Sequence, residues 1–232
     1  MIRMRWFKIV IALLSFVLVF SVATASTSAA TVNTKNSRVT FKLKDVSGKK
    51  YKVYILGSNE KKAIGSIDAK YDWALIWAGI NEGDRLYKGN YKIYIQKKGS
   101  SKISYTGYQM KNYIYNKTRK MIYWLPSKYK GQPDLLAIAE TESSNGESAN
   151  IYYVKSGKLK KTSSIGYTVR PRFAGKNKLQ IADYNNAVEV NPWRIDTYTF
   201  SPAKASFKRT SKKYYSFEKG GAIVHKWKRD WR

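Results

Sequence analysis

Acidic residues are scarce in this chain, which has 44 Lys and Arg against 15 Asp and Glu, yet several gather in residues 134–147. Glu140, Glu142, Asn145 and Glu147 offer oxygen atoms of the kind that Ca²⁺ binds, about 6–8 at a time. The stretch ETESSNGE lacks the alternating Asp residues of a calcium loop, and the later segment DYNNAVEV has no Gly at all. We therefore expect no metal and no cofactor, but a solvated loop whose acids pair with nearby lysines.

Paired carboxylates could also hydrolyse a glycan if they faced each other across a cleft, about 5–10 Å apart. Glu140 and Asp183 end two similar apolar segments, and Asp72 with Glu82 is a second possible pair. This alternative, an exported hydrolase, requires Glu140 and Asp183 to line one concave pocket. A platform for stacking sugars could come from the indole rings of Trp73, Trp77 and Trp193.

Other catalytic chemistry has little support in the sequence. His225 is the only histidine and the chain has no cysteine, so zinc sites of the usual kind are excluded. No glycine-rich phosphate loop of the G-x-G-x-x-G or G-x-x-x-x-G-K-[ST] type occurs. We expect a protein that is not an enzyme.

Hydrophobic residues recur every second position through most of the chain after residue 30. The segment RVTFKLKD at 38–45 alternates apolar and polar residues, and 91–98 and 150–155 are rich in Tyr, Ile and Val. Alternation of this kind, broken by Gly- and Ser-rich turns, is typical of β-strands and hairpins. We therefore predict an all-β fold.

A repeated unit of strand, loop, strand, tight turn and strand divides that β region. Leu136-Ala137-Ile138-Ala139-Glu140 at the start of one unit resembles Leu179-Gln180-Ile181-Ala182-Asp183 at the start of another. Units of about forty residues with three or four strands have the size of propeller blades. We expect antiparallel blade-like units in a small or incomplete β-propeller, or alternatively a stacked β-sandwich, with 220–228 as a closing strand. The expected repeats lie near 74–106, 135–163 and 179–211.

Residues 1–30 have the order of a secretory signal peptide. Arg3, Arg5 and Lys8 precede an apolar run, and small residues follow it. We expect one all-β domain over residues 31–232 that is secreted and extracellular or associated with the cell wall. Its charge is +26, because the +29 of the whole chain loses these three basic residues and no acid.

Such a charge attracts polyanions over a long range. We expect a binding protein whose Lys-rich outer strands associate with anionic cell-surface or extracellular polymers. The partners expected are anionic wall polymers or an anionic membrane surface, with nonspecific binding of nucleic acid also possible. An inhibitor of an acidic partner protein is a further alternative. The expected anion-binding residues are Lys158, Lys160, Lys161, Lys208, Arg209, Lys212 and Lys213.

Overall fold

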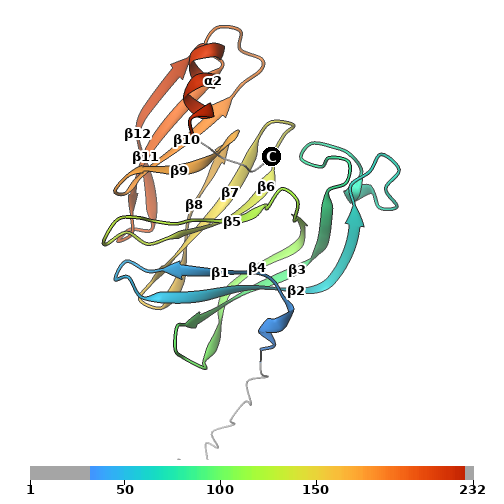
Figure 1. Ribbon diagram of the computed structural model, residues 1–232, viewed down its shortest axis with the longest axis vertical. Coiled ribbons are helices and arrows are strands. Elements are labelled where there is room, and N and C mark those ends of the chain that lie inside the picture. The colour runs from blue at the N-terminus through green and yellow to red at the C-terminus, as the bar shows by residue number, and fades with distance from the viewer. Residues whose placement is uncertain (1–31, 228–232) are drawn as a thin grey trace, which may run out of the picture. The chain divides into compact units, whose positions relative to one another are not determined.

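The computed structural model describes residues 32–227 and shows an all-β protein (Figure 1). Twelve strands form three antiparallel sheets of four strands each, and a 3₁₀ turn, η1 (Thr34–Asn36), precedes the first strand. The expected signal peptide at 1–30 lies outside the described residues. Within residues 32–227, no helix has both the length and the apolar character that crossing a membrane requires.

Each sheet is made of consecutive strands in chain order, paired as a simple meander. The first sheet has the order β1-β2-β3-β4, the middle sheet β5-β6-β7-β8 and the third sheet β12-β11-β10-β9. Among residues 32–227 the pairing stays within these sheets, apart from two isolated bridges, and does not close a barrel. The strands are β1 (Ser37–Lys44), β2 (Lys50–Ile64), β3 (Arg85–Lys97), β4 (Ile103–Asn116), β5 (Ile122–Leu125), β6 (Leu135–Thr141), β7 (Glu147–Lys155), β8 (Lys158–Tyr167), β9 (Val169–Gly175), β10 (Lys178–Tyr184), β11 (Trp193–Ser201) and β12 (Ser206–Tyr215).

The middle sheet contributes to a core that all three sheets share. Its strand β6 is buried from Leu135 to Ala139, so both of its faces are covered. Tyr152 packs against Tyr108 of the first sheet, and Tyr153 packs against Phe200 of the third, each with ring centroids 5.1 Å apart. An inner strand of this kind reads as a continuous apolar run because neither face meets water.

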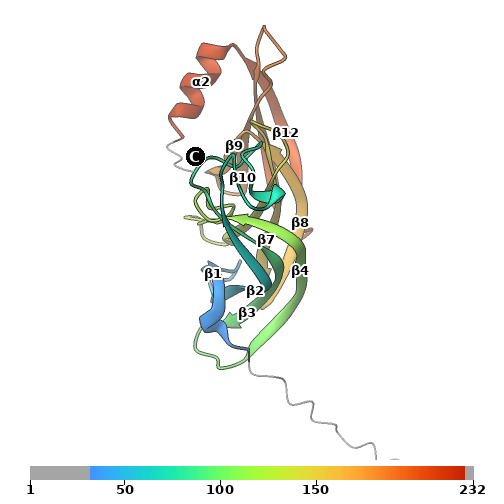
Figure 2. The same cartoon turned by 90° about the vertical axis from the view of Figure 1, so that its right-hand side faces the viewer.

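The last strand of each sheet in chain order, β4, β8 or β12, lies on the same side of the described part of the protein, and we call these three the outer strands. Figure 2 shows β4, β8 and β12 along the same side, with β1 and the helix α2 (Phe217–His225) on the opposite side. The segments 135–163 and 179–211 hold the second, third and fourth strands of the middle and third sheets. Each of these sheets begins with a strand, β5 or β9, that lies before the expected repeat.

Two expected strands are wrong. Residues 74–79, which would be the first strand of the expected repeat near 74–106, form no strand. They belong to a loop between β2 and β3 that includes the 3₁₀ turn η2 (Asp72–Ala74). Of the expected closing strand at 220–228, residues 220–225 are instead in α2 and residue 228 lies outside the described residues. The helix begins after Ser216, whose hydroxyl accepts a hydrogen bond from the backbone N–H of Lys219. A serine in this position is a common helix N-cap.

Candidate anion-binding surface

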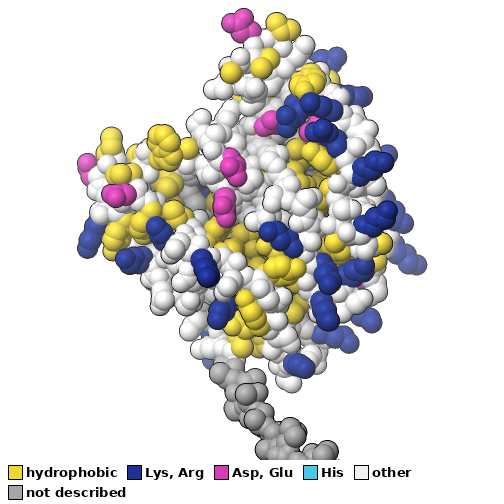
Figure 3. Space-filling model, turned by 180° about the vertical axis from the view of Figure 1, so that it is seen from behind, with side chains coloured by type: hydrophobic (Ala, Val, Ile, Leu, Met, Phe, Trp, Pro, Cys, Tyr) yellow, Lys and Arg dark blue, Asp and Glu magenta, His cyan; other side chains and the backbone are white. Residues whose placement is uncertain are grey.

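The outer strands β8 and β12 carry the basic residues that the sequence singled out. All seven of their side chains are exposed, and the two strands lie against each other across the edges of the middle and third sheets. Figure 3, which looks at the side of the outer strands, shows many Lys and Arg side chains over this face.

The pairing register divides these residues between different faces, because side chains alternate along a strand. Lys160 is opposite Tyr153, which packs toward the third sheet, whereas Lys161 is opposite Tyr152, which packs toward the first. In β12, Arg209 is opposite Tyr198 and Lys212 is opposite Asp196, on the face turned to the middle sheet.

Lys208 and Lys213 lie on the other face of β12. Lys213 is opposite Ile195 and is two residues before Tyr215, and both of these pack in the cluster beneath α2. The seven expected residues therefore fall into two groups. Lys158, Lys160, Arg209 and Lys212 face the gap between the middle and third sheets, while Lys161, Lys208 and Lys213 point elsewhere.

Arg209 differs from the lysines because it has an acidic partner. Its Nη1 is 3.5 Å from Oδ2 of Asp196, a side chain with no exposed surface. Arg194 contacts the same oxygen at 3.2 Å through Nε, and its Nη2 is 3.1 Å from Oδ2 of Asp183. Asp196 was not identified from the sequence as the partner of Arg209, because the two residues lie on different strands, β11 and β12. Arg209 is thus partly neutralised, whereas none of the six lysines has an ion pair within residues 32–227.

Glu147 is not on a solvated loop as expected; it is buried with 1% of its surface exposed. Its Oε1 is 2.8 Å from Nη2 of Arg119, and its Oε2 is 3.4 Å from Nε of Arg170. Arg170 also donates to the carbonyl of Arg119 at 2.8 Å. We call these three residues the buried charge cluster. It joins the β4–β5 turn, β7 and β9, so it ties the middle sheet to the third.

The remaining acids near Glu147 have separate structural roles. Asp134 is buried and accepts hydrogen bonds from the backbone N–H groups of Ser127 and Lys44, at 2.7 and 2.8 Å. Glu142 accepts a hydrogen bond from the Ser148 hydroxyl. Within residues 32–227 no group of three or more His, Cys, Asp or Glu residues could hold a metal ion.

The proposed pair of catalytic carboxylates does not share a cleft. Glu140 lines a hollow of about 610 Å³ beside the loop between β2 and β3, which also contains Trp73 and Trp77. Asp183 lines a different hollow of about 350 Å³ between the middle and third sheets. Trp193 lies in neither, because it packs with Tyr184 and against α2. Glu140 and Asp183 therefore do not line one pocket, as the hydrolase alternative expected of this pair, whereas Asp72 lines the same hollow as Glu140.

Buried tyrosines of β4, β7 and β8 resist ionisation. Burial, with smaller contributions from nearby carboxylates, raises the pKa of Tyr113 and of Tyr167 well above its usual value. Burial likewise raises the pKa of Tyr152 to about 12. These hydroxyls remain neutral donors, as in the 2.7 Å bond from Tyr113 to the carbonyl of Ala139.

Comparisons with known proteins identify no relative of this chain. No protein-family model matches it, no curated protein matches it, and no solved structure matches it.

Proposed function

We propose that the protein is a secreted, non-enzymatic binding protein of the cell surface or cell wall that associates with phosphate-bearing anionic polymers through β8 and β12. The observation that supports it is the exposure of six lysines on two adjacent outer strands, none of which has an acidic partner within residues 32–227. Paired surface charges contribute little to attraction at a distance, whereas unpaired charges of one sign add together.

The residue type favours a partner recognised by charge more than by shape. Lysine presents a compact, hydrated charge on a flexible stem, while arginine offers a planar fork for bidentate contacts. The only arginine among the seven expected residues, Arg209, is held by Asp196. A flexible polymer with regularly spaced phosphates suits such a surface, because many weak contacts act together.

The arrangement of the sheets supports this function. We propose that the three sheets are successive blade-like units of an incomplete propeller, since each is a four-strand meander and the fourth strands lie on the same side. That arrangement places the outermost strands next to one another and lets their charges act on one ligand.

The test compares two triple variants of equal charge. Lys158→Gln/Lys160→Gln/Lys212→Gln removes three lysines from the gap between the middle and third sheets. Lys35→Gln/Lys128→Gln/Lys130→Gln removes three exposed lysines far along the chain from these strands. With inorganic polyphosphate as the probe at low salt, the first variant should bind roughly a hundredfold more weakly, given about 1 kcal/mol per lysine at an anionic surface.

The matched variant should lose much less affinity. Equal losses in the two variants would show that only the total charge matters and would refute a role for β8 and β12. Vesicles containing phosphatidylserine serve as a second probe; stronger binding to them than to polyphosphate would replace the polymer with a membrane surface as the partner.

A further inference from the structure

A second surface of the protein differs in character from the basic strands. The loop between β2 and β3 and the ends of β4 and β6 enclose the hollow of about 610 Å³, whose lining includes Trp73, Trp77, Lys111, Tyr113 and Glu140. Its volume lies within the range of roughly 300–1,000 Å³ that is typical of small-molecule sites. In Figure 3 hydrophobic side chains gather on the lobe that this loop forms at the left edge.

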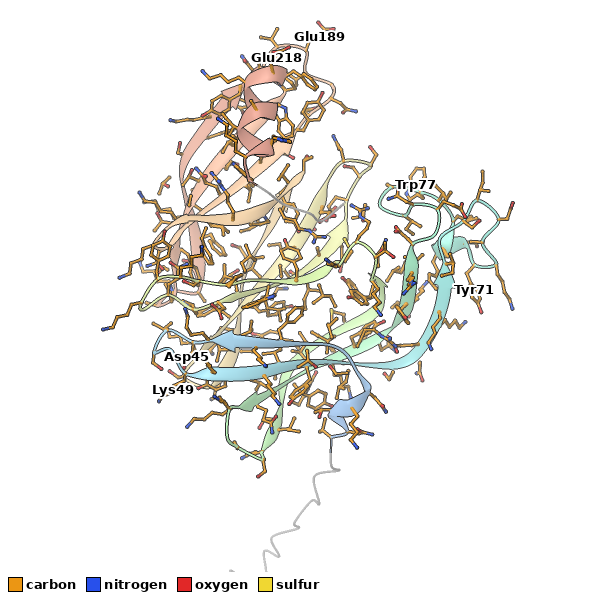
Figure 4. All side chains as sticks on the ribbon, viewed as in Figure 1. Asp45, Lys49, Tyr71, Trp77, Glu189 and Glu218 are labelled. Carbon is orange, nitrogen blue, oxygen red and sulfur yellow. The ribbon has the colours of Figure 1, made fainter. Side chains whose placement is uncertain are left out.

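Two tryptophans supply flat apolar surface at this hollow. Trp77 is 80% exposed, which is unusual for so large an apolar side chain. Trp73 also lines the hollow, and Tyr71 stacks on it with ring centroids 5.3 Å apart and planes 14° apart. Figure 4 labels Trp77 on the side of the loop nearer to the middle sheet and Tyr71 on its far side.

The loop that carries Trp77 is held in a defined conformation. Gly79 has φ +84°, and a Cβ atom there would lie 2.1 Å from the Thr141 hydroxyl and 2.8 Å from Nη1 of Arg119. Its carbonyl accepts a hydrogen bond from Asn116, at 3.3 Å. Ala74 is fully buried beneath the same loop. Trp77 is therefore presented by a rigid support, which lowers the entropic cost of binding.

Polar groups at the hollow have capacity to bind a ligand. Asp72 and Glu140 both line it, and neither forms an ion pair within the part of the chain that the structure describes. Lys111 and Asn112 lie on the β4 side and are exposed. Carboxylates accept hydrogen bonds, a lysine donates them and an amide does both, so the hollow offers both donors and acceptors to hydroxyl groups.

We propose that this hollow is a saccharide-binding site that takes a short oligosaccharide of uncharged or amine-bearing pyranose units. Such a ring has an apolar C–H face that packs on indole and a rim of hydroxyls that need hydrogen bonds. Asp72 and Glu140 disfavour acidic sugars and favour an ammonium group.

The test measures calorimetric binding of trimers of glucose, glucosamine and galacturonic acid to the exported protein in 0.5 M NaCl. This salt screens the basic strands, whose binding to polyphosphate should already be lost, so the two sites give separate results. Glucose and glucosamine trimers should bind, with glucosamine the stronger, and the galacturonic acid trimer should bind at least tenfold more weakly.

Variants assign the binding to the hollow. Trp77→Ala should weaken both productive trimers at least tenfold, and Glu140→Gln should weaken the glucosamine trimer more than the glucose trimer. Trp124→Ala serves as the matched control, since Trp124 is 42% exposed on β5 and does not line the hollow.

Three results would overturn the proposal. The first is no heat of binding with any trimer, and the second is equal binding by the Trp77→Ala variant. The third is a blue shift of tryptophan fluorescence with phosphatidylcholine vesicles, abolished by Trp77→Ala, in the absence of trimer binding; it would make the loop a lipid-inserting surface.

Discussion

The buried charge cluster and the lysines of β8 and β12 use charge in opposite ways. In the cluster, Glu147 is enclosed by Arg119 and Arg170 and has almost no contact with water. On the outer strands, Lys160 and Lys213 are exposed and have no acidic partner within residues 32–227. Charge in the first region orders the structure, and charge in the second is available to a ligand.

The choice between arginine and lysine follows this division. A buried charge must have its hydrogen bonds satisfied, and the guanidinium group offers several donors in a fixed geometry. Arg170 uses them on Glu147 and on the Arg119 carbonyl, and its guanidinium also lies 4.4 Å from the centre of the Tyr123 ring. An exposed lysine gains nothing from such geometry and keeps its hydration.

The largest expected effect comes from removing the acid of the buried charge cluster. Glu147→Gln leaves two buried arginines without a counter-charge, so the free energy of unfolding should fall by about 3–5 kcal/mol. Urea denaturation measures it. Glu142→Gln is the control, because Glu142 is exposed, and it should change stability by less than about 0.5 kcal/mol. Similar losses in both variants would contradict the distinction between buried and exposed charge.

The buried tyrosines predict a loss of stability at alkaline pH. A hydroxyl whose pKa is raised by folding stabilises the protein fully below the unfolded pKa of about 10, and this contribution disappears as the pH rises through the folded pKa. For Tyr152, whose folded pKa is about 12, the loss approaches about 2–3 kcal/mol at pH 12. Thermal unfolding between pH 8 and 12, with tyrosinate absorbance as a second signal, measures it.

Because Tyr113 and Tyr167 have pKa values raised further, their absorbance change should coincide with unfolding rather than precede it. The Tyr152→Phe variant is the control and should lose less stability over the same range. Ionisation of all tyrosines near pH 10 in the folded protein would contradict the burial that the structure shows.

Gly79 connects the saccharide-binding hollow to the buried charge cluster. Gly79→Ala places a methyl group against Thr141 and Arg119 at a positive φ, so stability should fall by about 1–3 kcal/mol. Trimer binding should weaken as well, because Trp77 is two residues away. Gly83→Ala is the matched control: it also has positive φ but meets no atom within 4 Å, so it should lose less stability and keep trimer binding. Equal effects would show that backbone conformation alone matters at Gly79.

The smallest expected effect on stability belongs to the outer strands. Lys158→Gln/Lys160→Gln/Lys212→Gln should change the free energy of unfolding by less than about 0.5 kcal/mol, since these side chains have no acidic partner in the part of the chain that the structure describes. Relief of repulsion between the lysines would raise stability at low salt but not at high salt, where the charges are screened. Urea denaturation at both salt concentrations measures this gain. A loss above about 1 kcal/mol would show that the lysines have a structural role.

Strands within 135–163 and 179–211 could be predicted from the sequence because burial of one face gives two-residue periodicity and burial of both faces gives a continuous apolar run, as in β6. The residues 74–79 were misread because Leu75, Ile76 and Trp77 are apolar yet exposed on a loop, where no periodicity constrains them. The helix at 217–225 is short, and its best signal was the capping residue Ser216 rather than a hydrophobic pattern.

The site was predictable only in part. Exposure of Lys158 and Lys160 follows from their alternation with Leu159, which is buried, whereas β12 has no buried residue that would set such a pattern. The buried charge cluster was not predictable, because Arg119 and Arg170 are 28 and 23 residues from Glu147 and meet it only when two sheets pack. The role of Arg209 likewise depends on a partner across the sheet, Asp196.

The salt dependence of polyphosphate binding tests the central claim most directly. In a plot of the logarithm of the association constant against the logarithm of salt concentration, each lysine–phosphate contact contributes a slope of about −0.7 to −0.9. The Lys158→Gln/Lys160→Gln/Lys212→Gln variant should therefore have a slope shallower by about 2–3, while the Lys35→Gln/Lys128→Gln/Lys130→Gln variant should retain the slope of the unmodified protein. Identical slopes for all three proteins would contradict binding through β8 and β12.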